Sequence, residues 1–120
     1  NTVKHNVYNG LTEKCAPREA IYSASVPRVD VMPSTVHLSG AEVELASVVA
    51  REYRLKNALH EITNDYDYIF IDCPPSLGML TINALVAAEE VLVPLQSEFF
   101  ALEGLSQLFR TIELVKKSLN

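Results

Sequence analysis

The segment Tyr66–Asp72 constrains the fold of this chain more than any other feature of the sequence. It is rich in residues that favour strands, and it becomes continuously apolar over Ile69–Ile71. A run without polar alternation is typical of a strand that is buried on both faces, as in parallel sheets. Pro74 and Pro75 end the run, because proline lacks the amide hydrogen that a sheet ladder needs. We therefore expect a parallel sheet built around this strand.

Helical and strand-like patterns alternate on both sides of that segment. Ser39 and Glu42 have the spacing of a capping box, and the apolar positions that follow predict one helix over Ala41–Ile62. The other expected elements are a short helix at Pro17–Ile21, strands at Val29–Met32 and Val91–Leu95, a helix at Leu77–Ala88 with Ser76 as its N-cap, and a terminal helix whose inner face carries Leu105, Leu108, Ile112, Val115 and Leu119. This alternation indicates an α/β fold with right-handed crossovers. Because three strands leave two open edges, the chain is expected to be part of a larger, doubly wound sheet.

Composition excludes several classes of protein. The 120 residues are 48% hydrophobic and 21% charged, which is the balance of one globular domain. No apolar stretch is long enough to span a bilayer, and Asn1–Asn6 lacks the apolar core of a secretory signal. Cys15 and Cys73 are too few for a disulfide framework, so a reducing cytoplasm is expected. The net charge of −5 gives no electrostatic support for nucleic-acid binding by this segment itself.

Asp72 is the first candidate for a functional residue. It follows the predicted strand directly, and would lie at the sheet edge where open α/β folds bind ligands. In P-loop NTPases a carboxylate at this place helps to hold the magnesium ion that bridges the β- and γ-phosphates. Magnesium prefers hard oxygen ligands and often binds them through water. The same pattern also fits a solvated aspartate at a strand end, so the residues alone leave both interpretations open.

A wider stretch of sequence resembles a known family. Asp67–Leu85 closely resembles the Walker B segment of the ParA/Soj chromosome and plasmid partition ATPases, and Val93–Leu105 resembles the strand and helix that follow it. Pro33–Glu42 and Arg51–Leu55 resemble the preceding strand and helix of the same family. The resemblance runs from about Val29 to Asn120. It implies that the chain is part of a mainly parallel P-loop NTPase sheet with helices on both faces.

The resemblance also implies a site and a function. Asp72 would be the Walker B aspartate that orders the magnesium-bound water, and Pro74, Pro75 and Ser76 would form a switch-like turn beside the γ-phosphate. The implied cofactors are therefore ATP and Mg²⁺. Family members are expected to form a homodimer around two nucleotides and to bind DNA non-specifically when loaded with ATP. They are expected to release DNA on hydrolysis stimulated by a ParB-type partner, in the nucleoid-associated cytoplasm and without a membrane.

The chain departs from the family pattern in one large respect. The glycine-rich loop with two lysines that grips phosphate is absent from these residues, which contain four glycines and no Gly-Lys-Thr or Gly-Lys-Ser. The aspartate that positions the attacking water, and most adenine and DNA contacts, are also expected elsewhere in a longer parent. We therefore interpret residues 1–120 as one partial domain. Without the phosphate cradle it should not hydrolyse ATP alone, so we assign it no catalytic residue.

Weaker candidates and alternatives complete the sequence-based interpretation. We expect no catalytic role for the widely spaced His5, His37 and His60, and we expect Cys73 to be a small buried residue. Lys116 and Lys117 are expected to form a solvated helix terminus, with DNA contact as the alternative. Glu98 and Glu103 are expected to favour a helix start, and Phe99 and Phe100 to lie in a core or interface. A MinD-like division-site ATPase is the nearest rival function. The Pro-Pro pair and Ala101–Gly104 favour the ParA branch. A non-catalytic α/β module that binds a partner protein is the alternative from another class.

Overall fold

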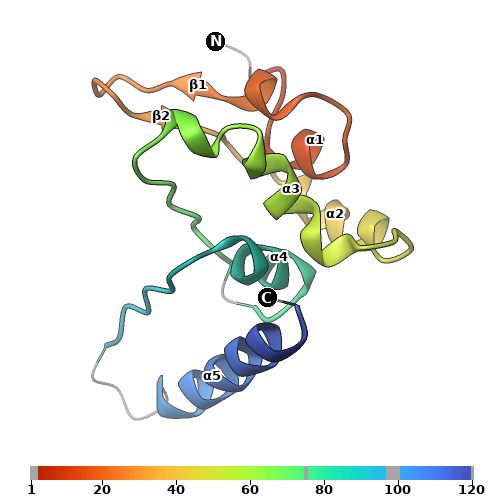
Figure 1. Cartoon of the computed structure of the whole chain (residues 1–120), viewed down its shortest axis with the longest axis vertical. Coiled ribbons are helices and arrows are strands. Elements are labelled where there is room, and N and C mark those ends of the chain that lie inside the picture. The colour runs from red at the N-terminus through yellow and green to blue at the C-terminus, as the bar shows by residue number, and fades with distance from the viewer. Residues whose placement is uncertain (1–2, 75, 97–100, 120) are drawn as a thin grey trace.

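The computed structural model describes residues 3–74, 76–96 and 101–119. Its elements follow in the order α1 (Val7–Leu11), η1 (Pro17–Ala20), β1 (Tyr22–Ser23), β2 (Asp30–Val31), α2 (Leu38–Leu45), η2 (Arg51–Tyr53), α3 (Arg54–His60), η3 (Thr63–Asp65), α4 (Met79–Ala87) and α5 (Ala101–Ser118). In Figure 1, α4 lies between the N-terminal elements and α5. The helix α4 therefore connects the N-terminal elements with α5.

The N-terminal part is built from short elements with local caps. Asn6 caps α1 by accepting a 2.9 Å hydrogen bond from the Tyr8 amide, and its own amide donates to the Asn9 side chain. The proline-initiated helix predicted at Pro17 is confirmed as the 3₁₀ helix η1. A strand forms at β2 as predicted, but it pairs antiparallel with β1, which the sequence analysis did not foresee. These elements form a hairpin rather than the start of a parallel sheet.

The long helix predicted over residues 41–62 is wrong, because the structure divides it into α2 and α3. Between them Ala50 adopts the left-handed conformation, with φ 55° and ψ 34°, which no α-helix contains. Val48 and Val49 precede it, and β-branched residues lose rotamer freedom in a helix. The capping box is also absent: α2 begins at Leu38, and the Ser39 hydroxyl donates to the Val36 carbonyl instead.

The segments predicted as parallel strands at 66–72 and 91–95 are not paired. Within the described ranges, the hairpin is the only sheet. A strand requires a hydrogen-bonded neighbour, and neither segment has one here. Their large side chains consequently face solvent, with exposed fractions of 82% for Tyr68, 87% for Phe70 and 87% for Leu92. The radius of gyration, 15.1 Å, exceeds the ~13.6 Å expected of a compact domain of this length.

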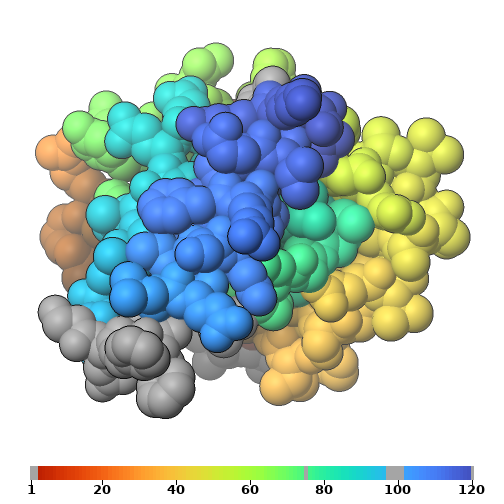
Figure 2. Space-filling view, turned by 90° about the horizontal axis from the view of Figure 1, so that it is seen from below, coloured from red at the N-terminus to blue at the C-terminus, as the bar shows by residue number. Residues whose placement is uncertain are grey.

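One cluster of the hydrophobic core lies between α4 and α5. Leu85 and Val86 of α4 are buried against Val115 of α5. The half-buried side chains that pack around them are Tyr53, Ile82, Ile112 and Leu119. Figure 2 shows α5 crossing the middle of one face of the molecule. The inner face predicted for the terminal helix is thereby confirmed at its C-terminal half, and the Tyr53 hydroxyl fixes its end by donating to the Leu119 carbonyl at 2.8 Å.

Candidate functional site

Asp72 lies in the loop that joins the segment 66–71 to α4, and its side chain is exposed. Among the described residues, neither a hydrogen bond nor an ion pair engages its carboxylate. Cys73 beside it is exposed rather than buried as predicted, because the unpaired segment has no neighbouring strand to cover it. Partial burial of the sulfur, and then the charge of Asp72, nevertheless raise the pKa of the Cys73 thiol. The loop thus presents a solvent-exposed carboxylate and a weakly nucleophilic thiol.

The turn that follows Asp72 is held by two hydrogen bonds. The Ser76 amide donates to the Pro74 carbonyl at 2.8 Å, and the buried Thr81 hydroxyl donates to the Ser76 carbonyl. The prediction that Ser76 is the N-cap of the next helix is wrong. The helix α4 begins later, and Gly78 is its N-cap. Pro75 lies outside the described residues. Asp72, Pro74 and Ser76 are therefore brought together in one short loop that α4 anchors.

The N-terminus of α4 contacts α2 through Glu42. No side chain within the loop caps α4. The Glu42 carboxylate, which the sequence analysis assigned to its own helix, lies instead beside Gly78 and accepts a long 3.5 Å hydrogen bond from the Leu80 amide. A carboxylate is favoured at a helix N-terminus, where amide groups lack partners and the helix dipole is positive. Glu42 thus serves as a cap supplied by another helix.

Asn83 anchors the other side of α4. It is 1% exposed, and its side-chain oxygen accepts a 3.1 Å hydrogen bond from the Leu55 amide. Its side-chain nitrogen donates to the Arg51 carbonyl at 2.9 Å and to the Met79 carbonyl at 3.0 Å. Sequence reasoning missed this residue. The available signal was a single amide side chain inside a mainly apolar helix, where a buried polar group requires partners.

Asp72 is the one sequence-predicted metal ligand of this loop. In the part of the chain that the structure describes, no three His, Cys, Asp or Glu side chains gather as a metal site. His5, His37 and His60 accordingly form no such cluster. A single carboxylate is consistent with magnesium, which takes its remaining ligands from phosphate and water. Asp72 can fill that role, whereas a zinc or calcium site needs several protein ligands.

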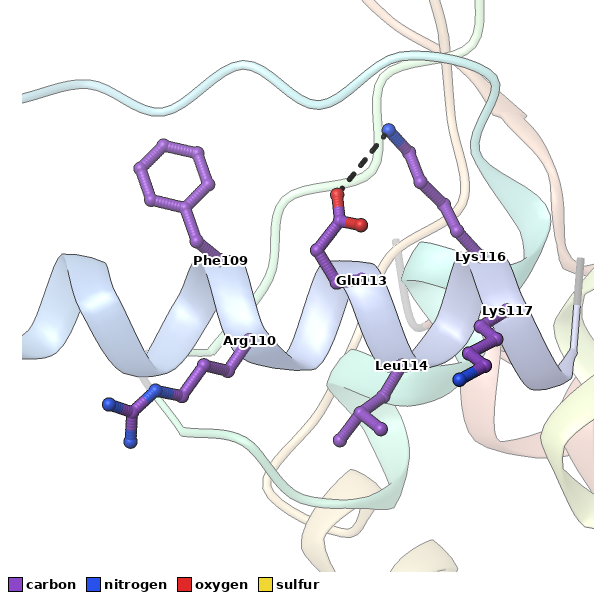
Figure 3. A pocket seen from close by; sticks show the side chains of 6 residues that line it. All are labelled: Phe109, Arg110, Glu113, Leu114, Lys116 and Lys117. Atoms are coloured by element: carbon purple, nitrogen blue, oxygen red, sulfur yellow. Dashed lines mark ion pairs between the residues drawn. The ribbon is translucent and has the colours of Figure 1, made fainter.

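The outer face of α5 offers no enclosed site. Figure 3 shows Phe109, Glu113 and Lys116 on one side of the helix, and Arg110, Leu114 and Lys117 on the other. All six side chains come from one helix, so the hollow they line is an open surface. Lys116 and Lys117 are exposed in the last turn, as predicted, and Lys116 pairs loosely with Glu113 at 4.0 Å. Glu103 is exposed in the first turn, while Glu98, Phe99 and Phe100 lie outside the described residues.

None of the helices in the described residues combines the length and apolar character needed to cross a membrane.

Comparisons with known proteins define the class. A family model described as an AAA domain matches residues 1–120. A structure of cobyrinic acid a,c-diamide synthase from Mycobacterium smegmatis, solved with a bound ATP analogue and magnesium, superposes with a TM-score of 0.93. The two chains are 39% identical, and the match covers 99% of this chain and 48% of that one. The chain therefore has the α/β, P-loop type of fold that the sequence predicts, although its segments 66–72 and 91–95 are not paired as strands.

Sequence relatives define the family within that class. The sporulation initiation inhibitor protein Soj of Bacillus subtilis is 51% identical over 118 residues, which is 98% of this chain and 47% of that protein. The chromosome partitioning protein ParA of Myxococcus xanthus is 49% identical over 120 residues, which is 100% of this chain and 42% of that protein. The chain belongs to the ParA/Soj family of partition ATPases. It spans about half the length of the curated relatives it matches.

Proposed function

We propose that these 120 residues form the central part of a ParA-type ATPase domain that serves chromosome or plasmid partitioning. The observation that carries this proposal is the solvent-exposed Asp72 carboxylate, placed on the loop that leads directly into α4. Support comes from the 51% identity to Soj and from the match to a protein solved with an ATP analogue and magnesium. Those ligands belong to that neighbour, and their transfer to this chain is part of the proposal.

In the proposed site, the Asp72 carboxylate would order a water molecule bound to the magnesium ion of ATP. The ion would supply positive charge that offsets the charge on the transferred phosphoryl group. Pro74, Pro75 and Ser76 would line the same turn, next to the γ-phosphate. The Thr81 hydroxyl, which holds the Ser76 carbonyl, would keep that turn in place. The phosphate-gripping loop would come from outside these residues.

The exposed apolar segments support the proposal of a partial domain. Tyr68 and Phe70 stack at 6.5 Å between ring centroids, yet both remain largely open to solvent. Such side chains belong in a sheet interior, and the longer relatives have about as many residues again to form it. We propose that the intact protein completes the sheet. Dimerisation with ATP, non-specific DNA binding, a ParB-type partner and a nucleoid-associated location are then properties of that intact protein.

Calorimetry of ATP binding tests the proposal. The chain extended in both directions to its full reading frame should bind ATP with magnesium, and the 120 residues alone should not. The Asp72→Ala variant of the extended protein should lose about tenfold or more in magnesium-dependent affinity, since a hydrogen bond or ligand contact to a charged group contributes ~1.5–3 kcal/mol. Asp67→Ala is the matched control, because it removes the same charge at the other end of the apolar segment.

Three results would contradict the proposal. If the extended protein does not bind ATP, a non-catalytic module that binds a partner protein becomes the better account. If the reading frame extends but ATP binding is equal in the Asp72→Ala and Asp67→Ala variants, Asp72 is a solvated loop residue. A MinD-like function would be indicated instead if the extended protein binds anionic lipid vesicles when loaded with ATP and does not bind DNA.

A further inference from the structure

We propose that Glu42 of α2 is a positioning residue for the Asp72 loop. Its carboxylate would set where α4 begins, and through α4 where Asp72 stands relative to magnesium and nucleotide. This inference rests on the proposed ATPase function. It adds a residue from a different helix, α2, to the machinery that the loop residues form.

Two observations place Glu42 against the start of α4. Its Oε1 atom is 3.5 Å from the Leu80 amide nitrogen. A Cβ added to Gly78 would lie 2.2 Å from the same oxygen, so the carboxylate packs directly on the Gly78 backbone. Glu42, Gly78 and Leu80 are all partly shielded from solvent. The carboxylate therefore occupies a defined position beside the N-cap and a helical amide.

A short covalent and hydrogen-bonded path connects this contact to Asp72. Gly78 lies two residues after Ser76, whose carbonyl accepts from Thr81 in the first turns of α4. The Ser76 amide in turn bonds to the Pro74 carbonyl, two residues after Asp72. A shift of the α4 N-terminus would move this turn with it. Misplacing a metal ligand by a fraction of an ångström weakens binding without unfolding the protein.

A second glutamate on the same helix has different contacts. Glu44 binds the Tyr8 hydroxyl and accepts a 3.0 Å hydrogen bond from Lys14. These contacts lie at α1 and the turn after it, and none reaches the Asp72 loop. Glu44→Ala thus removes an equal charge from α2 while leaving the Gly78 contact intact. It is the matched control for Glu42.

The test is a double-mutant cycle in the extended protein. Glu42→Ala, Gly78→Ala, the double variant, Glu42→Gln and the control Glu44→Ala are compared. The readouts are the magnesium concentration that half-saturates ATP binding, and the urea midpoint of unfolding. Gly78→Ala is informative because the three nearest neighbours of the added methyl group all belong to the end of the flexible Glu42 side chain. The substitution should therefore displace the Glu42 carboxylate rather than the backbone.

We expect Glu42→Ala and Gly78→Ala each to raise the half-saturating magnesium concentration by about five- to tenfold, the effect of losing one ordinary hydrogen bond. The double variant should be no worse than either single variant, because both remove the same contact. Glu42→Gln keeps an acceptor for Leu80 and should stay within about threefold of the wild type.

Each contrary outcome has a distinct meaning. If the wild-type extended protein binds ATP with magnesium but all variants half-saturate at the same concentration, Glu42 is not a positioning residue, even if the urea midpoint falls. If the effects of Glu42→Ala and Gly78→Ala multiply in the double variant, the two residues act separately and the inference fails. If the wild type itself does not bind ATP, the proposed function fails first and the inference fails with it.

Discussion

Replacing Asn83 tests how α4 is attached to the rest of the protein. The Asn83→Ala variant deletes the acceptor of the Leu55 amide and the donor to the Arg51 carbonyl. The third partner, the Met79 carbonyl, lies within α4 one turn earlier. The two groups outside α4 would lose their partners in a place that water barely reaches, since Asn83 is 1% exposed.

The expected cost follows from these orphaned groups. A polar group buried without a partner costs about 1–3 kcal/mol. Two such groups, partly relieved by water entering the space, predict a loss of about 2–4 kcal/mol in the free energy of unfolding. With a urea dependence of about 2 kcal/mol per M, the unfolding midpoint should fall by about 1–2 M. This is a large share of the stability of a typical domain.

Urea unfolding of the extended protein, followed by helical circular dichroism, measures this loss. Asn57→Ala is the matched control, because Asn57 is an exposed asparagine on α3 and alanine favours a helix. Its free energy of unfolding should stay within about 0.5 kcal/mol of the wild-type value. If Asn83→Ala and Asn57→Ala unfold at the same urea concentration, the Asn83 hydrogen bonds do not hold α4 against α3, and the argument for a rigid loop anchor fails.

Two further predictions use single residues. Asp72→Asn, in a Cys15→Ser background, should speed alkylation of Cys73 at neutral pH. Burial and then the Asp72 charge raise the pKa of the Cys73 thiol, so removing the charge lowers this pKa and increases the thiolate fraction. An unchanged pH–rate profile of alkylation would contradict this prediction. Ala50→Gly should raise the free energy of unfolding by about 0.5 kcal/mol, because relief of ~1–2 kcal/mol of left-handed strain exceeds the added entropy of the unfolded chain. Ala46→Gly, at a right-handed position, should lower it, and equal urea midpoints for the two glycine variants would refute the assignment at Ala50.

Local patterns predicted the elements whose stability is local. The terminal helix followed from a repeated apolar face, and η1 from a proline at its first position. The helix over residues 41–62 failed because one apolar face extends over α2 and α3, while the break at Ala50 depends on a single backbone conformation. The strand segments failed differently. Their composition is that of strands, but pairing needs neighbours that the described residues do not supply.

The candidate site divides in the same way. The order of Asp72, the turn and α4 could be predicted, because it follows the chain. The supporting contacts could not, because they join residues far apart: Glu42 and Leu80 are separated by 38 positions, and Asn83 and Leu55 by 28. Asp72 as a magnesium ligand stays a prediction that the calorimetric experiment tests, and the roles of Pro74, Pro75 and Ser76 beside it stay predictions.

The exposed segment around Tyr68 and Phe70 could pair with other chains, and the residues at its borders oppose such aggregation. Four consecutive residues, Tyr68–Ile71, are uncharged and strand-prone, which is typical of sequences that pair with copies of themselves. Asp67 and Asp72 bracket them with negative charge, and Pro74 follows. Charges and prolines at such borders act as gatekeepers. The carboxylate proposed to serve magnesium would therefore also keep a newly made strand from joining another chain before its own sheet closes.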